Sequence, residues 1–177
     1  MKHLLSIALF NLVLFSGVVK ADLAISVSGI EEGKIASVHA CSKNGGKDLS
    51  PEIVVTAIPS EAKFVTVIVD DPDVQPGAGK TWVHWNIFDV PVTGSSMTFE
   101  EGSKSKGKVG KNSAGSSKYQ GMCPPNGNHT YRFAVFTQSG EVKVKSGFSA
   151  KAVTIEDFET KNKHLILSKA VVTGDFG

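Results

Sequence analysis

Two short stretches combine carboxylates, an imidazole and aromatic side chains. An apolar run ends in a group of acidic residues at a proline, and a second run about ten residues later encloses a histidine between two tryptophans. The residues are Asp70, Asp71, Asp73, Trp82, His84 and Trp85. Taken alone, Asp71 and His84 are most simply explained as a hydrogen-bonded pair in the core. A strand that ends in a proline-bearing turn, followed by a second strand, would hold them.

A third stretch adds a rigid loop and two more polar side chains. Gly121 and the pair Pro124 and Pro125 predict a narrow, stiff entrance, because proline fixes the backbone. His129 and Tyr131 follow two residues apart, so they lie on one face of the strand expected to begin there. Three separate polar clusters with aromatic neighbours indicate one pocket.

Several catalytic and nucleotide-binding motifs fail in this sequence. Gly102 to Val109 approaches the P-loop pattern, but Val109 stands where a hydroxyl must hold magnesium, and the glycines that follow do not favour a helix. Neither a Gly-x-Ser-x-Gly elbow nor a His-Glu-x-x-His motif occurs. The aspartates around Pro72 lack calcium-loop spacing. No metal, cofactor or catalytic residue is therefore predicted.

The remaining pattern predicts a mainly β chain with one late helix. Thr154 has the features of an N-cap with acids behind it, and Phe158 to Lys163 can continue the helix before Leu165 to Val172 returns to strand composition. Turn residues separate the expected antiparallel strands. These strands are Leu23 to Val27, Lys34 to His39, Glu52 to Ile58, Phe64 to Val69, Trp82 to Val90, Tyr131 to Thr137 and Glu141 to Val144.

Gly102 to Gly121 is predicted to be a long surface loop, because it is rich in Gly, Ser, Lys and Asn. Its five lysines are unaccompanied by any acid: Lys104, Lys106, Lys108, Lys111 and Lys118. Two interpretations remain open, a solvated linker-like excursion and a positive rim beside an anion site.

The first 21 residues have the composition of a cleavable signal peptide. A basic start is followed by an apolar run from Leu4 to Val19 and a small-residue cleavage site at Ala21. A membrane anchor is the alternative, but the run is short and interrupted by polar residues. Cleavage would remove two lysines and leave 17 basic against 17 acidic residues. A neutral domain argues against nucleic-acid binding, and no later segment is apolar enough to cross a membrane.

Residues 22–177 are then expected to form a single domain in the periplasm or outside the cell. Its two cysteines, Cys41 and Cys123, would meet an oxidising compartment, which favours a disulfide between them. Two buried free thiols are the alternative.

These motifs together resemble the phosphatidylethanolamine-binding protein family, also called Raf-kinase-inhibitor-like, and in particular its bacterial exported branch. The resemblance covers most of the mature chain. It is carried by Leu49-Ser50-Pro51, Asp71-Pro72-Asp73, His84-Trp85 and the run from Asn112 to Gly127, which contains Cys123-Pro124-Pro125. Exported members tend to carry cysteines at positions that match Cys41 and Cys123, which supports the disulfide.

The resemblance implies an antiparallel β-sandwich with a short C-terminal helical element and a compact anion pocket at one end. The implied ligand-binding residues are Asp71, His84, Gly121, Pro124, Pro125, His129 and Tyr131, with Trp82, Trp85 and Tyr119 as pocket wall. Imidazoles and backbone N–H groups would donate to a phosphate, phosphoethanolamine or carboxylate. Asp71 would orient a histidine or bind an amine.

Two positions depart from the family's usual pattern. Asp89 replaces an asparagine, and Thr130 replaces an arginine between the histidine and the tyrosine.

Three functions are compatible with this sequence. The first is an exported, non-catalytic binding or regulatory protein for a small anionic or phosphorylated ligand. The second is an inhibitor of a protease or kinase, or a secreted effector with a protein target. The third is an esterase or phosphodiesterase in which His84 or His129 is the general base and Asp71 orients it. The sequence does not determine the oligomeric state.

Overall fold

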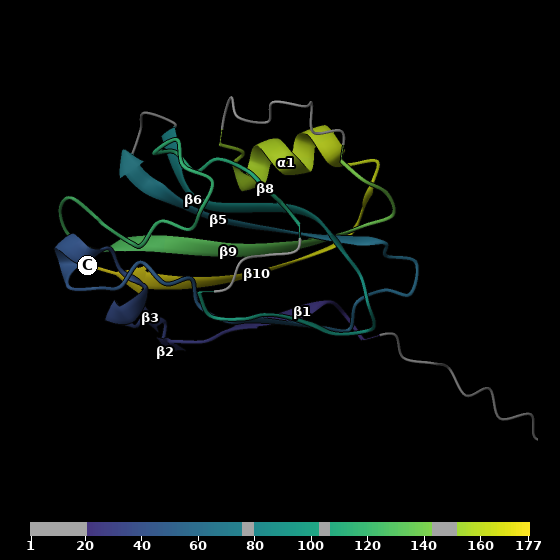
Figure 1. Ribbon diagram of the computed structural model, residues 1–177, viewed down its shortest axis with the longest axis horizontal. Helices are drawn as coiled ribbons and strands as arrows, with labels where there is room; N and C mark the ends of the chain where they lie inside the picture. The colour runs from purple at the N-terminus through teal and green to yellow at the C-terminus, as the bar shows by residue number, and fades with distance from the viewer. Residues whose placement is uncertain (1–20, 76–79, 103–106, 143–151) are drawn as a thin grey trace, which may run out of the picture.

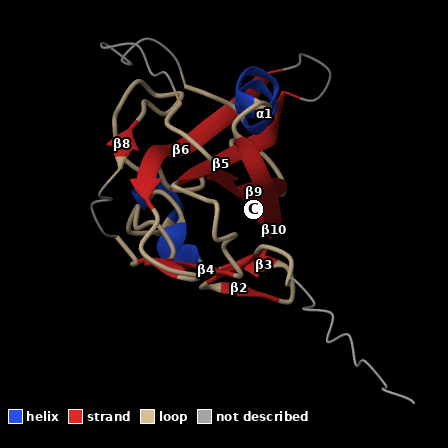
Figure 2. Ribbon diagram, turned by 90° about the vertical axis from the view of Figure 1, so that its right-hand side faces the viewer, coloured by secondary structure: helices blue, strands red, loops and turns tan. Residues whose placement is uncertain are grey.

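The computed structural model describes residues 21–75, 80–102, 107–142 and 152–177. The predicted signal peptide and two of the loop lysines, Lys104 and Lys106, lie outside the described residues. Two sheets and one helix form the layers. In Figure 1, α1 lies on one side of the large sheet and the small sheet on the other, and Figure 2 shows the same order from the side.

The small sheet has the order β1-β4-β7 and the large sheet the order β2-β3-β10-β9-β5-β6-β8. Their strands are β1 (Ala24–Val27), β4 (Ile53–Thr56) and β7 (Met97–Phe99), and β2 (Ile30–Glu31), β3 (Lys34–Ile35), β10 (Ile166–Phe176), β9 (His129–Gln138), β5 (Phe64–Gln75), β6 (Lys80–Pro91) and β8 (Lys108–Val109). The described helical segments are η1 (Ser37–His39), η2 (Ser42–Asn44) and α1 (Ile155–Asn162). The mainly β class is therefore confirmed, although the two sheets are unequal and β10 pairs with β3 in parallel.

The two faces of the large sheet bury different cores. Apolar residues of β5 and β9 alternate between the two faces, so that Val67 and Phe133 face the small sheet, whereas Ile68 and Phe136 face α1. The helix completes the second core through Phe158, whose ring centroid lies 4.8 Å from that of Phe136. Within the described part of the chain, no helix is long and apolar enough to span a bilayer.

The predicted start of the helix is confirmed. The hydroxyl of Thr154 accepts a hydrogen bond from the backbone N–H of Asp157 at 3.1 Å, as expected of an N-cap. An ion-pair cluster then fixes this end to the sheet. Arg132 on β9 donates to both carboxylate oxygens of the fully buried Asp70, at 2.8 and 3.0 Å, and also to Glu156 in the first turn of α1. The second oxygen of Asp70 also accepts from the N–H of Ile155.

Three expected elements differ from the structure. β5 does not end at the carboxylates but continues to Gln75, with irregular pairing to β6 after Asp71. In the predicted strand from Lys34 to His39, only Lys34–Ile35 pairs in the sheet, and Ser37–His39 forms η1 instead. Glu141 and Val142 are not in a strand, and the rest of that predicted strand lies outside the described residues.

The described part of the predicted surface loop is attached to the outer edge of β6. The N–H groups of Gly110, Ser113 and Gln120 donate to carbonyls of β6 at 3.0, 2.9 and 3.1 Å. Asn112 is buried and holds the turn through bonds to Ser116 and to the carbonyl of Lys118. A linker-like excursion is therefore the wrong description of residues 107–121.

Candidate functional site

A cavity of about 230 Å³ opens at one end of the large sheet. β5, β6 and β9 each supply part of its wall, and the segment after Tyr119 supplies the rest. Its lining residues are Asp71, Val74, Trp82, His84, Gln120, Cys123, Pro125 and Tyr131. The sequence predicted that three polar stretches meet in one pocket. The structure brings one residue of each stretch into this cavity, namely Asp71, His84 and Tyr131.

A β-bulge places His84 in this cavity. Val69 pairs with Trp85, but Asp70 pairs with Val83, so β6 contains one extra residue at this point. Regular alternation would put His84 and Trp85 on opposite faces of the sheet. Because a bulge re-aims a side chain, Trp85 packs in the core between the sheets while His84 lines the cavity beside Tyr131, with ring centroids 5.2 Å apart.

The tautomer of His84 follows from its partner. Its Nδ1 lies 2.8 Å from the backbone carbonyl of Gln120, and a carbonyl can only accept, so Nδ1 carries the hydrogen. Burial lowers the pKa of His84, and the Gln120 bond and the charge of Asp71 offset this only in part. The neutral ring therefore has its lone pair on Nε2, which has no hydrogen-bond partner within the described part of the chain.

Asp71 pairs with His129 rather than with His84. The Oδ2 atom of Asp71 lies 2.8 Å from Nδ1 of His129, and its Oδ1 accepts the backbone N–H of Asp73 at 2.8 Å. The expected Asp71–His84 pair is therefore wrong. His129 lies in a neighbouring hollow, which shares Val74 and Pro125 with the cavity.

Two residues expected to form the pocket wall belong to the core instead. Trp85 and Tyr119 are both buried, and their rings meet edge to face with centroids 5.9 Å apart. The Tyr119 hydroxyl donates to the carbonyl of His39 at 3.0 Å. Trp82 alone of the three predicted wall residues lines the cavity.

Gly121 has a structural role that the sequence did not indicate. Its N–H donates to the carboxylate of Asp48 at 3.0 Å, so this donor is already occupied. A Cβ at this position would lie 2.4 Å from the backbone of Ala40 and Cys41. Glycine is needed here because two backbone segments nearly touch, and neither Gly121 nor Pro124 is among the residues that line the cavity.

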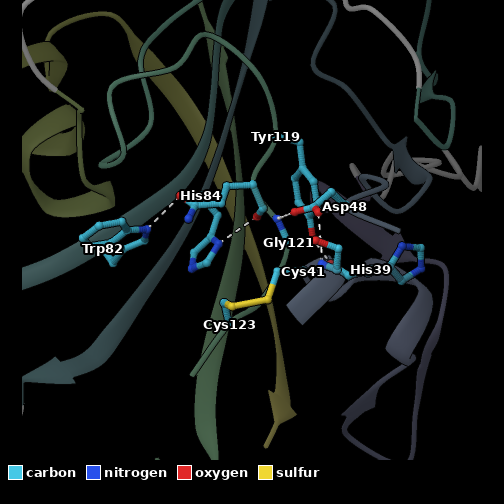
Figure 3. Close-up of a disulfide and its surroundings, with 10 residues drawn as sticks. His39, Cys41, Asp48, Trp82, His84, Tyr119, Gly121 and Cys123 are labelled. Atoms are coloured by element: carbon cyan, nitrogen blue, oxygen red, sulfur yellow. Dashed lines mark hydrogen bonds between the residues drawn. A yellow bond between two sulfur atoms is a disulfide. The ribbon is translucent and has the colours of Figure 1, made fainter. Parts of the chain in front are cut away.

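The predicted disulfide between Cys41 and Cys123 is confirmed, with Cα atoms 5.5 Å apart. Figure 3 shows how it joins the segment after Gly121 to the segment that carries His39 and Cys41. The same two segments are also joined by a hydrogen bond from Cys41 N–H to the carbonyl of Met122 at 3.0 Å. Because Cys123 lines the cavity, the disulfide fixes part of its wall.

Gln120 is the lining residue that sequence reasoning missed. Its side-chain Oε1 accepts from the indole N–H of Trp82 at 3.0 Å, and its carbonyl accepts from His84. Figure 3 shows the bonds from Trp82 and His84 that end on this segment. The sequence contained no signal for this role, because a glutamine inside a polar loop has no distinguishing spacing.

Tyr131 presents the most informative polar atom of the site. Among the described side chains, its hydroxyl oxygen is the buried polar atom that lacks a hydrogen-bond partner. Burial raises the pKa of Tyr131, and the charges of Asp71 and Asp73 raise it further, so the hydroxyl keeps its hydrogen. No cluster of metal-binding side chains occurs among the described residues.

The family profile named phosphatidylethanolamine-binding protein matches residues 26–177. The chain belongs to the phosphatidylethanolamine-binding protein family. It is 35% identical to a UPF0098 protein of Aquifex aeolicus over 147 residues, which is 80% of each chain. It is 31% identical to the UPF0098 protein PH1269 of Pyrococcus horikoshii over 167 residues, covering 85% of this chain and 80% of that protein.

Solved structures of family members have the same fold. A phosphatidylethanolamine-binding protein homolog from Chlamydia trachomatis superposes with a TM-score of 0.73 at 25% identity, covering 88% of this chain and 97% of that one. YbcL of Escherichia coli superposes with a TM-score of 0.72 at 21% identity, covering 88% and 98%.

The two departures from the family pattern each have local partners. Asp89 accepts from Lys108 at 3.0 Å and from the N–H of Val142 at 2.9 Å, so one lysine of the loop is paired away from the cavity. The Thr130 hydroxyl donates to Asp175 at 2.8 Å. Neither residue is among those that line the cavity, and Lys108 does not contribute to a positive rim around it.

A pH dependence of stability follows from the burial of His84. Since its folded pKa is lowered, the unfolded chain binds more protons between that pKa and the ordinary value of 6.5. The free energy of unfolding should therefore rise with pH through this window and lose the His84 contribution at more acidic pH. We expect His84→Asn to show a shallower slope in urea unfolding between pH 5 and 7.5. Equal slopes for the two proteins would contradict this.

Proposed function

We propose that this chain is an exported, non-catalytic binding protein whose cavity accepts a small anionic group, such as a phosphate, phosphoethanolamine or a carboxylate. The observation that carries the proposal is the buried Tyr131 hydroxyl without a partner at the cavity wall. An unsatisfied buried polar group costs about 1–3 kcal/mol. A ligand oxygen that accepts from this hydroxyl would remove that cost.

The surroundings of the hydroxyl support binding in preference to turnover. Both cysteines are in the disulfide, so neither is available as a nucleophile. Asp71 and His129 do form a pair that can orient a base, but no serine, threonine or cysteine of the described residues is hydrogen-bonded to the His129 ring. The apolar walls from Val74, Trp82 and Pro125 lower the local dielectric constant, which strengthens each polar contact.

The export part of the proposal rests on the composition of the first 21 residues. Fractionation of the native host and sequencing of the mature N-terminus tests it. We expect the periplasm or the medium to contain a chain that begins at Asp22. A full-length chain in the cytoplasm would refute export without affecting the binding proposal.

Titration followed by NMR tests the binding proposal. Phosphate, phosphoethanolamine and acetate are added separately to the mature protein at pH 6, and the ring signals of His84 and His129 are followed. We expect the His84 signals to shift and saturate with at least one of these anions, whereas His39, buried at 1% exposure away from the cavity, should not respond. If all three anions leave both the His84 and the His129 signals in place, the proposal is wrong.

A further inference from the structure

The polar atoms of the cavity form a mixed pattern of donors and acceptors, and one residue determines most of it. Gln120 binds its neighbours through three groups. Its N–H donates to the His84 carbonyl, its own carbonyl accepts from the His84 ring, and its side-chain oxygen accepts from Trp82. The indole N–H is only a donor, so it fixes which end of the Gln120 amide is oxygen. The amide NH₂ has no partner in the described part of the chain.

This arrangement leaves three groups to meet a ligand. The Gln120 NH₂ is a donor, the Tyr131 hydroxyl can donate or accept, and His84 Nε2 is an acceptor as long as Nδ1 holds the ring hydrogen. The titratable groups around the His84 ring are Asp71 of β5 and His129 of β9, which are hydrogen-bonded to each other. A ligand that satisfies all three groups needs acceptor oxygens and one hydrogen to donate.

We propose that Gln120 determines the ligand selectivity of the cavity, because it donates to an oxyanion and forces His84 to accept a hydrogen from it. The preferred ligand class is therefore a singly protonated phosphomonoester. A phosphodiester has acceptor oxygens but no P–OH hydrogen, so it leaves the lone pair of His84 Nε2 facing an oxygen. This inference rests on the proposed function and adds the residue and the protonation state that the function requires.

The test compares two esters of the same head group. Phosphoethanolamine, a monoester, and glycerophosphoethanolamine, a diester, are titrated calorimetrically into the mature protein at pH 6, near the second pKa of a phosphomonoester of about 6. We expect the monoester to bind at least ten-fold more tightly. Equal affinities would overturn this inference alone. Binding of neither ester, together with silent NMR titrations, would overturn the proposed function and this inference with it.

Two substitutions separate the roles of the residues. His84→Asn retains an amide donor near the position of Nδ1 but lacks the acceptor at Nε2, so the monoester preference should disappear. Gln120→Glu retains an acceptor for Trp82 but replaces the donor with a charge, so monoester affinity should fall at least ten-fold. Ser117→Glu adds the same charge at an exposed position three residues earlier and should bind as the wild type does.

A cooperative thermal unfolding transition is required of each variant, as the check that it is folded, before its affinity is interpreted. Gln120→Leu is a second variant without the donor and without added charge, and it should also lose monoester affinity. A folded Gln120→Glu protein that binds phosphoethanolamine as the wild type does would overturn the inference. The same holds if His84→Asn keeps the preference for the monoester.

Discussion

Replacing both cysteines by serine should lower the free energy of unfolding by about 4–5 kcal/mol, because the disulfide closes a loop with a sequence separation of 82 residues. The bond constrains the unfolded chain more strongly the longer the loop is. The shape of the cavity should change as well, because Cys123 lines the cavity and is fixed by its bond to Cys41. Urea unfolding of the oxidised wild type and of the Cys41→Ser/Cys123→Ser protein measures the first effect.

A matched control comes from the wild type treated with a reductant. It should unfold at nearly the same urea concentration as the double variant, because both lack only the covalent bond. Addition of the same reductant to the double variant should change nothing. If the reduced wild type is as stable as the oxidised protein, the disulfide does not hold this fold together.

Arg132→Met should destabilise the protein by about 3–5 kcal/mol, the usual cost of leaving a buried charge without its partner. Asp70 has no exposed side-chain surface, and Arg132 binds both of its oxygens. Burial already raises the pKa of Asp70, and the guanidinium opposes that rise. Without Arg132 the carboxyl should take up a proton, so the loss of stability should be smaller at acidic pH. Urea unfolding at pH 5 and pH 8 measures both effects.

Glu156→Gln is the appropriate control for the cluster. Its side chain is 60% exposed, so its ion pair with the same arginine should contribute only about 0–1 kcal/mol. The double substitution Asp70→Leu/Arg132→Met should recover much of the loss, since it leaves no unpaired charge. If Arg132→Met lowers the free energy of unfolding no more than Glu156→Gln does, the buried Asp70–Arg132 pair does not fix α1 to the sheet.

The sequence predicted those parts of the fold that depend on local pattern. The N-cap at Thr154 was found because a capping residue followed by acids acts within one turn. Most longer strands were found from their β-branched runs. The continuation of β5 through Pro72 was missed, since proline normally marks the end of a central strand.

The sequence predicted part of the set of residues that line the cavity, but not the hydrogen bonds between them. The sequence indicated one pocket for Asp71, His84 and Tyr131 from three polar stretches with aromatic neighbours, and the family resemblance implied the same residues. It could not show that Asp71 bonds His129 and not His84, because the bulge that orients His84 has no sequence signature here. The occupied N–H of Gly121 depends on Asp48, which lies 73 residues earlier in the chain.

The loop along β6 has a consequence for how this protein behaves at high concentration. A bare strand edge offers unpaired N–H and C=O groups to any other chain and is a starting point for aggregation. Here the N–H groups of Gly110, Ser113 and Gln120 donate hydrogen bonds to backbone carbonyls of β6. Deletion of residues 110–118 would therefore leave backbone carbonyls of β6 unpaired beside the cavity, and we expect the shortened protein to aggregate.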